Sequence, residues 1–262
     1  MKKFFLMSFV ALLALTMVSC LGLGYRGNTL ADDTPTQVTD TNQVTKMQPF
    51  GRVDIEGAFK VIYEQGSEYS VRVEASELAL KQMTVYVEDS VLCIHESRYE
   101  PATPLDDVKV YVTAPDLFKI NLLGSGMFAA DNAITVDTCL IVIVMGSGMV
   151  QLASADCHGK AIFSVDEGTN LELGHLKAEE TIASIDGSGN INLGSLECKF
   201  LRADVTGSGC LNCDNINADE AEINITGSGN VNLKGTVKNV TKEITGKGLL
   251  NITQATSADS VK

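Results

Sequence analysis

The residues of this chain best placed for chemistry are acidic side chains that recur within a repeated segment. Asp166 and Asp186 each stand just before a corner of the repeat, and Asp204 lies two residues earlier in the next copy, with Arg202 nearby. Residues two apart on a strand share a face, so Asp186 and Asp204 are expected to converge on the outside. Carboxylates near a cation suit the cleavage of a sugar polymer. The alternative is a solvated acidic face, and we expect no catalytic residues.

Cysteines and histidines form a second group of reactive residues. Cys210 and Cys213 have the spacing of a metal or redox motif, but an odd offset on a strand puts the two thiols on opposite faces. Cys93, Cys198 and Cys213 fall at apolar positions, where cysteine behaves as a small core residue. The histidines share no position of the repeat: His95, His158 and His175. We expect no metal, no cofactor and no disulfide framework.

Glycine triplets are the third candidate, because glycine-rich loops can cradle phosphates. A dinucleotide loop also needs a third glycine, a following helix and an acidic residue further on, and no copy has them. A calcium-binding nonapeptide repeat would need a different period. The alternative is a tight corner, since glycine adopts positive φ without steric cost. We expect structural corner glycines at Gly124, Gly126, Gly146, Gly148, Gly187, Gly189, Gly207, Gly209, Gly227, Gly229, Gly246 and Gly248.

The triplets mark a repeat whose copies begin 19 to 22 residues apart, at Gly124, Gly146, Glu167, Gly187, Gly207, Gly227 and Gly246. The copy at Glu167 lacks the triplet, and the last copy reads Gly-Lys-Gly. Apolar residues stand two and four positions before the first glycine, as Val205 and Ala203 do. They also stand four and six positions after it, as Leu211 and Cys213 do, with polar residues between. This alternation indicates two strands joined by a corner, with one apolar face.

One copy alone cannot bury such a face, but stacked copies share a continuous core. The repeat therefore predicts an all-β protein, a parallel single-stranded β-helix or solenoid with rungs of about 20 residues. Right-handed winding is expected from crossover chirality. We expect regular rungs over 119–255 and larger, less regular rungs over 46–118, with one short helix capped by Ser76.

Asparagines occupy two outward positions of the repeat. The first position holds Asn170, Asn190 and Asn230, and the second holds Asn192, Asn212, Asn232 and Asn251. Stacked asparagine side chains can hydrogen-bond along the axis of the stack, so we predict a structural ladder. The same flat polar face could bind a glycan or a protein partner.

The N-terminus reads as an export signal. Lys2 and Lys3 precede an apolar run that is too short for a comfortable membrane span, and Ser19-Cys20 follows. The ending resembles a lipobox, which predicts a lipoprotein signal peptide over 1–19 and lipidation of Cys20. An ordinary secretory signal is the alternative. We expect a flexible tether over 20–45 and a polar tail over 256–262.

The charge of the chain limits its partners. The net charge is −13, and removal of 1–19, which holds two lysines and no acid, makes it −15. Nucleic acid is not an expected partner, because phosphate backbones need a basic surface.

Three stretches carry a family resemblance: FGRVDIEGAFKVIYEQGSEYSVRVEAS (50–76), VKVYVTAPDLFKINLLGSG (108–126) and the repeated GSGNINL-like units. Together they resemble the auto-transporter adhesin head GIN domain family over 46–255. The resemblance implies a β-helical fold and suggests surface attachment, and it brings no catalytic residues. The chain departs from the family repeat at DEGTN (166–170), Met127 and Met149.

These observations predict an exported cell-envelope lipoprotein, held at the outer membrane and facing the periplasm or the surface. Its solenoid head is expected to be a non-catalytic adhesion or interaction module that binds an unknown glycan or protein. The alternatives are a β-helix polysaccharide lyase or hydrolase, or a purely structural surface protein.

Overall fold

The computed structural model describes residues 38–40, 42–97 and 107–253. The predicted signal peptide 1–19, the predicted lipidation site Cys20 and the predicted tail 256–262 lie outside the described residues. The described residues form strands joined by tight turns, together with one short helix, α2 (Glu77–Leu80). Ser76 caps α2 as predicted: the Ala79 backbone N–H donates to Ser76 Oγ at 3.1 Å.

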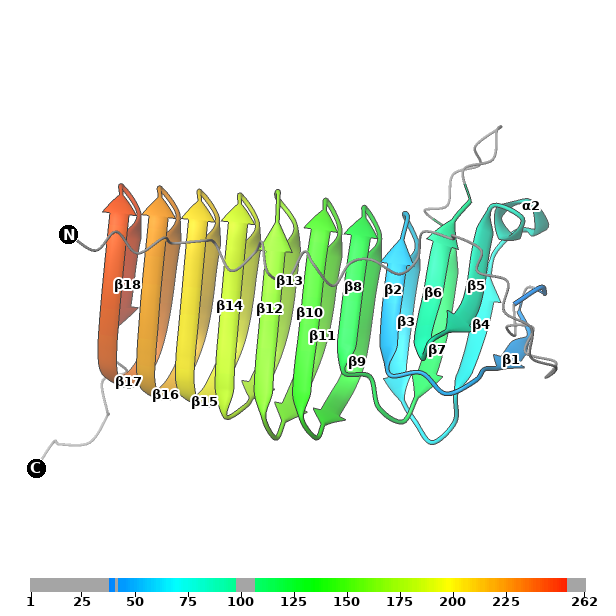
Figure 1. Ribbon diagram of the computed structural model, residues 1–262, viewed down its shortest axis with the longest axis horizontal. Helices are drawn as coiled ribbons and strands as arrows, with labels where there is room; N and C mark the ends of the chain where they lie inside the picture. Colours follow the sequence, from blue (N-terminus) through cyan, green and yellow to red (C-terminus); the bar gives the residue numbers. More distant parts are fainter. Residues whose placement is uncertain (1–37, 41, 98–106, 254–262) are drawn as a thin grey trace, which may run out of the picture. The chain divides into compact units, whose positions relative to one another are not determined.

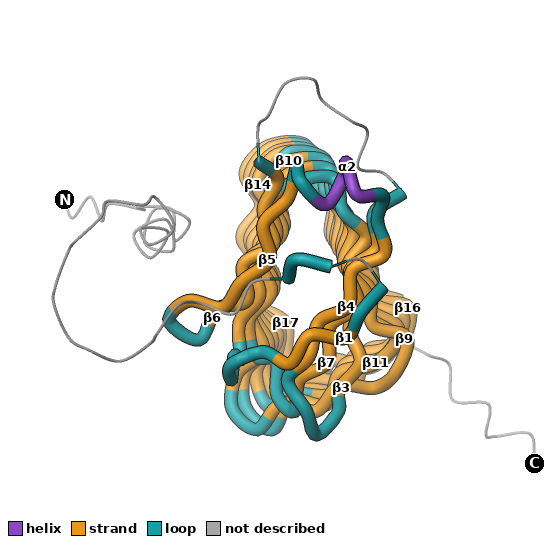
Figure 2. The backbone as a smooth tube through the Cα atoms, turned by 90° about the vertical axis from the view of Figure 1, so that its right-hand side faces the viewer, coloured by secondary structure: helices purple, strands orange, loops and turns teal. Residues whose placement is uncertain are grey.

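The repeated segment winds into a stack of rungs with two sheets (Figures 1 and 2). Sheet 1 contains the strands before each corner, namely β8 (Lys119–Gly124), β10 (Cys139–Gly146), β12 (Lys160–Asp166) and β14 (Glu180–Gly187). Sheet 2 contains the strands after each corner, namely β9 (Met127–Val136), β11 (Met149–Cys157) and β13 (Asn170–Lys177). Longer strands pass through the second bend and contribute to both sheets: β15 (Asn190–Gly207), β16 (Cys210–Gly227) and β17 (Asn230–Gly246). The last strand is β18 (Leu249–Thr253).

Neighbouring rungs pair in parallel, and their register follows the repeat. Val205 lies opposite Ile185 on one side and Ile225 on the other, and Gly207 lies opposite Gly187 and Gly227. The predicted inward positions form the core, where Val205 is 1% exposed. The parallel β-solenoid predicted from the repeat is confirmed.

The N-terminal rungs do not stack in the order of the sequence (Figure 1). The first strands are β1 (Val44–Lys46), β2 (Arg52–Glu56), β3 (Lys60–Gln65) and β4 (Ser70–Glu74). They are followed by β5 (Met83–Glu88), β6 (Val91–Glu96) and β7 (Lys109–Ala114). The β2–β3 rung lies between the β6–β7 rung and the β8–β9 rung, and it pairs in parallel with both. The N-terminal rungs therefore belong to the same parallel stack as the repeat, but their order in space differs from their order in the chain.

An antiparallel layer covers the N-terminal end of the stack. Strand β4 pairs antiparallel with β7 and β1, and β5 pairs antiparallel with β6. Val38 is buried there, and its N–H donates to the Val85 carbonyl at 3.1 Å. Residues 42–45, which we expected to be tether, instead run along β4 and hydrogen-bond to its backbone.

The C-terminal end of the stack is open in the described residues. Its last rung exposes four large apolar side chains, at 36% to 59% of their surface: Val240, Ile244, Leu249 and Ile252. Val240 and Ile244 lie in register with buried Ala221 and Ile225, and Ile252 with buried Leu233. They are exposed because no further described rung covers them.

Candidate functional site

The glycine corners are built so that successive rungs can touch. Gly207 has φ +110°, and a Cβ on it would lie 2.4 Å from the Gly187 carbonyl oxygen. A Cβ on Gly209 would lie 2.4 Å from the Gly189 carbonyl oxygen. The Ser208 N–H donates to the Gly187 carbonyl at 2.8 Å, so this amide is used between rungs and does not face a ligand. The geometry is that of a structural corner.

The copy without a triplet makes its corner from other groups. Glu167 has φ +43° and Gly168 has φ +96°. Thr169 is fully buried, and its hydroxyl donates to the Asp166 carbonyl at 2.7 Å. The Asp166 carboxylate accepts the Glu167 N–H at 2.9 Å. Asp166 thus takes part in the turn itself, which gives it a structural role.

The acidic candidates do not meet as predicted. Asp186 lies in register with Asp166 and Thr206, whereas Asp204 lies in register with Ser184 and Asn224. The expected convergence of Asp186 with Asp204 is therefore wrong, because the register keeps them two positions apart along the strand.

Asp204 is instead the centre of a polar cluster on sheet 1. Its Oδ2 accepts from Arg202 Nε at 2.8 Å, and its Oδ1 accepts from Asn224 Nδ2 at 2.8 Å. Glu222 lies 3.8 Å from Arg202 Nη1. The hydrogen bond to Asp204 raises the pKa of the Arg202 guanidinium, so the arginine is held charged and its charge is locally compensated. This arrangement is a surface ion pair with both carboxylate oxygens occupied.

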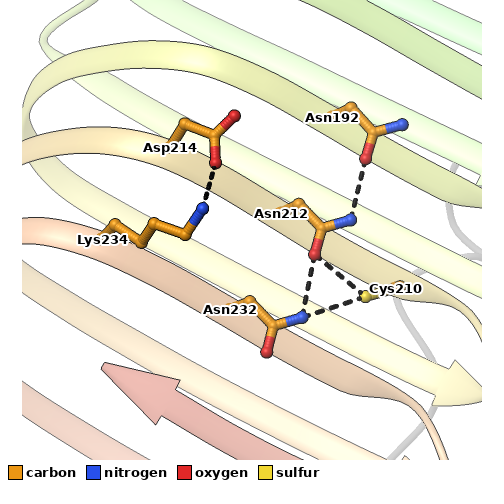
Figure 3. A network of polar contacts seen from close by, with 6 residues as sticks. All are labelled: Asn192, Cys210, Asn212, Asp214, Asn232 and Lys234. Carbon is orange, nitrogen blue, oxygen red and sulfur yellow. Dashed lines mark hydrogen bonds and ion pairs between the residues drawn. The ribbon is translucent and has the colours of Figure 1, made fainter. Parts of the chain in front are cut away.

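Sheet 2 carries the predicted asparagine ladder (Figure 3). Asn212 Nδ2 donates to Asn192 Oδ1 at 2.8 Å, and Asn232 Nδ2 donates to Asn212 Oδ1 at 2.8 Å. Beyond the residues drawn, Asn251 Nδ2 donates to Asn232 Oδ1 at 2.7 Å. In the neighbouring column, Asn190 Nδ2 donates to Asn170 Oδ1 at 3.0 Å. The stacking of identical amides along the solenoid axis is confirmed.

Cys210 interrupts the shorter column and joins the longer one. Its thiol lies 3.3 Å from Asn212 Oδ1 and 3.4 Å from Asn232 Nδ2, as Figure 3 shows. Cys210 is half-buried on the outside, whereas Cys213 is 1% exposed in the core. The two thiols therefore lie on opposite faces, as the spacing predicted. No set of three metal-ligating side chains comes together in the residues that the structure describes.

A shallow groove of about 430 Å³ runs beside the ladder. The ladder amides form one part of its wall, and Glu172, Asp214 and Lys234 form another. Lys234 Nζ lies 2.6 Å from Asp214 Oδ1, so the charges there are paired (Figure 3). The groove offers amide donors and acceptors in a repeating row and little net charge.

Similar charge pairs line the second bend of the rungs. Lys199 Nζ lies 2.5 Å from Glu179 Oε1, and Lys238 Nζ lies 2.6 Å from Asp219 Oδ1. The hydrogen bond from Lys199 lowers the pKa of Glu179. Two histidines make polar contacts to neighbouring rungs: His158 Nδ1 lies 3.4 Å from Asp137 Oδ1, and His175 Nδ1 lies 2.7 Å from the Ser195 hydroxyl. These pairs link neighbouring rungs and give the histidines surface positions.

Comparison with known proteins identifies the family of the chain. A family model described as "Putative auto-transporter adhesin, head GIN domain" matches residues 49–254, which is most of the chain. The chain belongs to this family. No curated protein matches it at a significant level.

Solved structures share the head GIN fold at low identity. One, described as a "putative adhesin" from Bacteroides fragilis, has 20% identity and a TM-score of 0.74, covering 84% of this chain and 98% of that one. A "putative lipid binding protein" from Parabacteroides distasonis has 19% identity and a TM-score of 0.70, covering 84% and 97%. A "putative adhesin" from Parabacteroides merdae has 19% identity and a TM-score of 0.62, covering 84% and 97%. At such identities the likeness shows the fold alone.

The descriptions of the relatives of this head GIN protein agree in kind. Its family and these neighbours are described as adhesins or as lipid-binding, not as enzymes. Within the described residues, no helix has the length and hydropathy of a membrane span.

Proposed function

We propose that this head GIN protein is an exported lipoprotein of the cell envelope whose solenoid is a non-catalytic adhesion or interaction module. The observation that carries the proposal is the asparagine ladder of sheet 2, a regular row of amides along several rungs. The adhesin description of the family and the lipid-binding description of one structural neighbour support a role in surface interaction.

The ladder leaves hydrogen-bonding capacity for a ligand. A carboxamide has two N–H donors and two acceptor lone pairs, and the ladder uses one of each on Asn212 and Asn232. The Cys210 thiol takes the second lone pair of Asn212 and the second N–H of Asn232. Asn212 keeps one N–H and Asn232 keeps one lone pair, on neighbouring rungs about 4.8 Å apart, the spacing between paired strands. A glycan or protein segment with regularly placed hydroxyl or amide groups could be read by such a row.

A binding screen tests the proposal. The chain from residue 20, with Cys20→Ala, is applied to glycan arrays and to envelope and host protein arrays. We expect a specific ligand whose binding falls in the Asn212→Ala/Asn232→Ala variant. The matched control, Thr206→Ala/Thr226→Ala, changes exposed residues of sheet 1 and should retain binding. Absence of any ligand, or equal loss in the control, would contradict the proposal.

Lipidation has its own test. In the wild-type chain, fatty-acid label is expected on Cys20, and Cys20→Ala should release the protein from membranes and abolish labelling. Membrane retention of the unlabelled variant would contradict the lipoprotein part of the proposal and would leave the interaction module unaffected.

The enzymatic alternative is tested at Asp186. Wild type and Asp186→Ala are compared for reducing sugar and unsaturated products from uronate polymers. We expect no product from either protein. If wild type forms product and Asp186→Ala does not, the protein is a carbohydrate-active enzyme and the non-catalytic proposal is wrong.

A further inference from the structure

Strand β10 of sheet 1 is apolar on both faces. Leu140, Val142 and Val144 point into the core and are fully buried. The alternate, outward positions hold Cys139, Ile141, Ile143 and Met145. The corresponding outward positions of later rungs are mostly charged or polar, as Arg202, Asp204 and Thr206 illustrate. A strand that is apolar on both faces is typical of one that is covered on both sides.

The apolar outward positions continue on the neighbouring rungs. Ile141 lies in register with Ile162, and Ile162 with Ile182, so three isoleucines stack on the outside of sheet 1. Met145 lies in register with Leu123 of the preceding rung. We call this group of six residues the outer apolar patch: Leu123, Ile141, Ile143, Met145, Ile162 and Ile182. Apart from Ile143, which is 7% exposed, its members are partly exposed.

Two cations adjoin the outer apolar patch on the side that faces the N-terminal end of the stack. Lys119 is the register partner of Ile141, and Arg52 is the register partner of Lys119. The Arg52 guanidinium donates to the backbone carbonyl of Asp89. Neither cation forms an ion pair with an acidic side chain among the described residues. Glu56 lies in register with Leu123, so the patch adjoins cations on one part of its border and a carboxylate on another. An apolar patch beside cations without an ion-pair partner suits acyl chains below a layer of phosphate groups.

The outer apolar patch lies close to the point where the described chain begins. The described chain begins at Val38, against β5 at the N-terminal end. From there, β6, β2, β8 and β10 follow in spatial order (Figure 1), so β10 lies about 19 Å along the axis, four strand spacings away. Residues 20–37 number 18, and a chain of that length spans at most about 60 Å. A membrane that holds Cys20 is thus within reach of the patch.

We propose that the outer apolar patch is a membrane-docking surface, which lays sheet 1 against the phospholipid bilayer that anchors the chain. Arg52 and Lys119 contact lipid phosphates, while Ile141, Ile162 and Ile182 enter the interface. This inference rests on the proposed lipid anchor at Cys20. Docking in this way leaves the asparagine ladder of sheet 2, on the other face of the solenoid, open to a ligand.

Vesicle flotation without the anchor tests the docking surface. The chain from residue 20 with Cys20→Ala keeps every described element, and it is floated with vesicles of equal parts phosphatidylethanolamine and phosphatidylglycerol. We expect binding that falls by about tenfold or more in Ile141→Thr/Ile182→Thr, because burial of each isoleucine contributes substantially to partitioning. Lys119→Gln should also weaken binding.

The matched control places the same change at the far end of the solenoid. Ile244→Thr/Ile252→Thr removes two isoleucines that are each 36% exposed, and it should bind vesicles like the parent. Lys247→Gln is the corresponding control for Lys119→Gln. Thermal unfolding of each variant checks that it is folded, and Lys119→Gln keeps the test valid if the isoleucine variant unfolds.

Three outcomes would overturn the docking surface. The first is failure of the Cys20→Ala parent to float. The second is a loss of binding in the control as large as that in Ile141→Thr/Ile182→Thr. The third is sedimentation of the parent as a dimer that this variant dissociates. The last result would make a second copy of the chain the occupant. Fatty-acid labelling of wild-type Cys20 is scored separately, so a labelled protein without docking refutes the docking surface and leaves the lipid anchor intact.

Discussion

The side chain of Asn212 donates a hydrogen bond to Asn192 and accepts one from Asn232, both at 2.8 Å. It therefore links three rungs through one residue. Each link crosses from one turn of the solenoid to the next and adds to the backbone pairing of β15, β16 and β17. The ladder is both a structural device and the most regular polar feature of the surface.

Asn212→Ala should destabilise the solenoid by about 1–2 kcal/mol, since it removes two hydrogen bonds between rungs. Chemical denaturation, followed by circular dichroism, measures the change in the free energy of unfolding. Asn217→Ala is the control, because Asn217 is an exposed asparagine on the same strand, and it should change stability by less than about 0.5 kcal/mol. Equal effects would show that the ladder contributes no stability.

Val205→Asp should destabilise the protein by about 3–5 kcal/mol, because it places an unpaired carboxylate in the core. Val205 is 1% exposed between Ile185 and Ile225. Thermal unfolding monitors the loss. Thr226→Asp makes a change of similar size at an exposed outward position and should leave the melting temperature nearly unchanged. An unaltered melting temperature for Val205→Asp would contradict the inward assignment.

Gly207→Ala should cost more stability than Gly168→Ala. Both glycines have positive φ, +110° and +96°, so both substitutions introduce backbone strain of about 1–3 kcal/mol. Only at Gly207 would the new Cβ also meet a backbone oxygen, that of Gly187, at 2.4 Å; at Gly168 the nearest atom is Ser188 Oγ at 3.5 Å. Denaturation midpoints compare the two variants. A larger loss in Gly168→Ala would rule out close rung contact as the reason for the corner glycines.

Stability should fall at alkaline pH, in part because of Cys198. Burial raises the pKa of this thiol from 9.0 to about 12, so the folded state keeps a proton that the unfolded chain releases. The folded state then binds more protons than the unfolded state above pH 9.0, and the free energy of unfolding decreases as pH rises towards 12. At one unit above the unfolded pKa, the loss is about 1.4 kcal/mol.

Cys198→Ala should flatten this alkaline decline. Alanine fits the position, because Cys198 lies in register between Ala178, one rung earlier in the repeat, and Ala218 in the next rung. Urea denaturation over the alkaline range compares the variant with wild type. An identical decline in both proteins would mean that the Cys198 thiol ionises as easily in the folded state as in the unfolded one.

Sequence reasoning reached the repeat, its inward positions and the asparagine ladder, because each depends on a period that one sequence displays. The sequence did not predict the Arg202–Asp204–Asn224 cluster. A carboxylate on the outside of the sheet has several possible partners, and side-chain geometry decides which of them it contacts. The outer apolar patch had a visible signal in CLIVIVM (139–145), where outward positions are as apolar as inward ones.

The sequence by itself determined the rung, its corner and its buried face, because the spacing of glycines and apolar residues leaves one arrangement that buries the core of each copy. Only the tertiary structure decided that β2 and β3 lie between β6–β7 and β8–β9. The N-terminal strands carry no common period that sets their phase. Their order is fixed by long-range pairing: β6 and β7 pair in parallel with β2 and β3, and β5 and β4 pair antiparallel with the outer edges of β6 and β7.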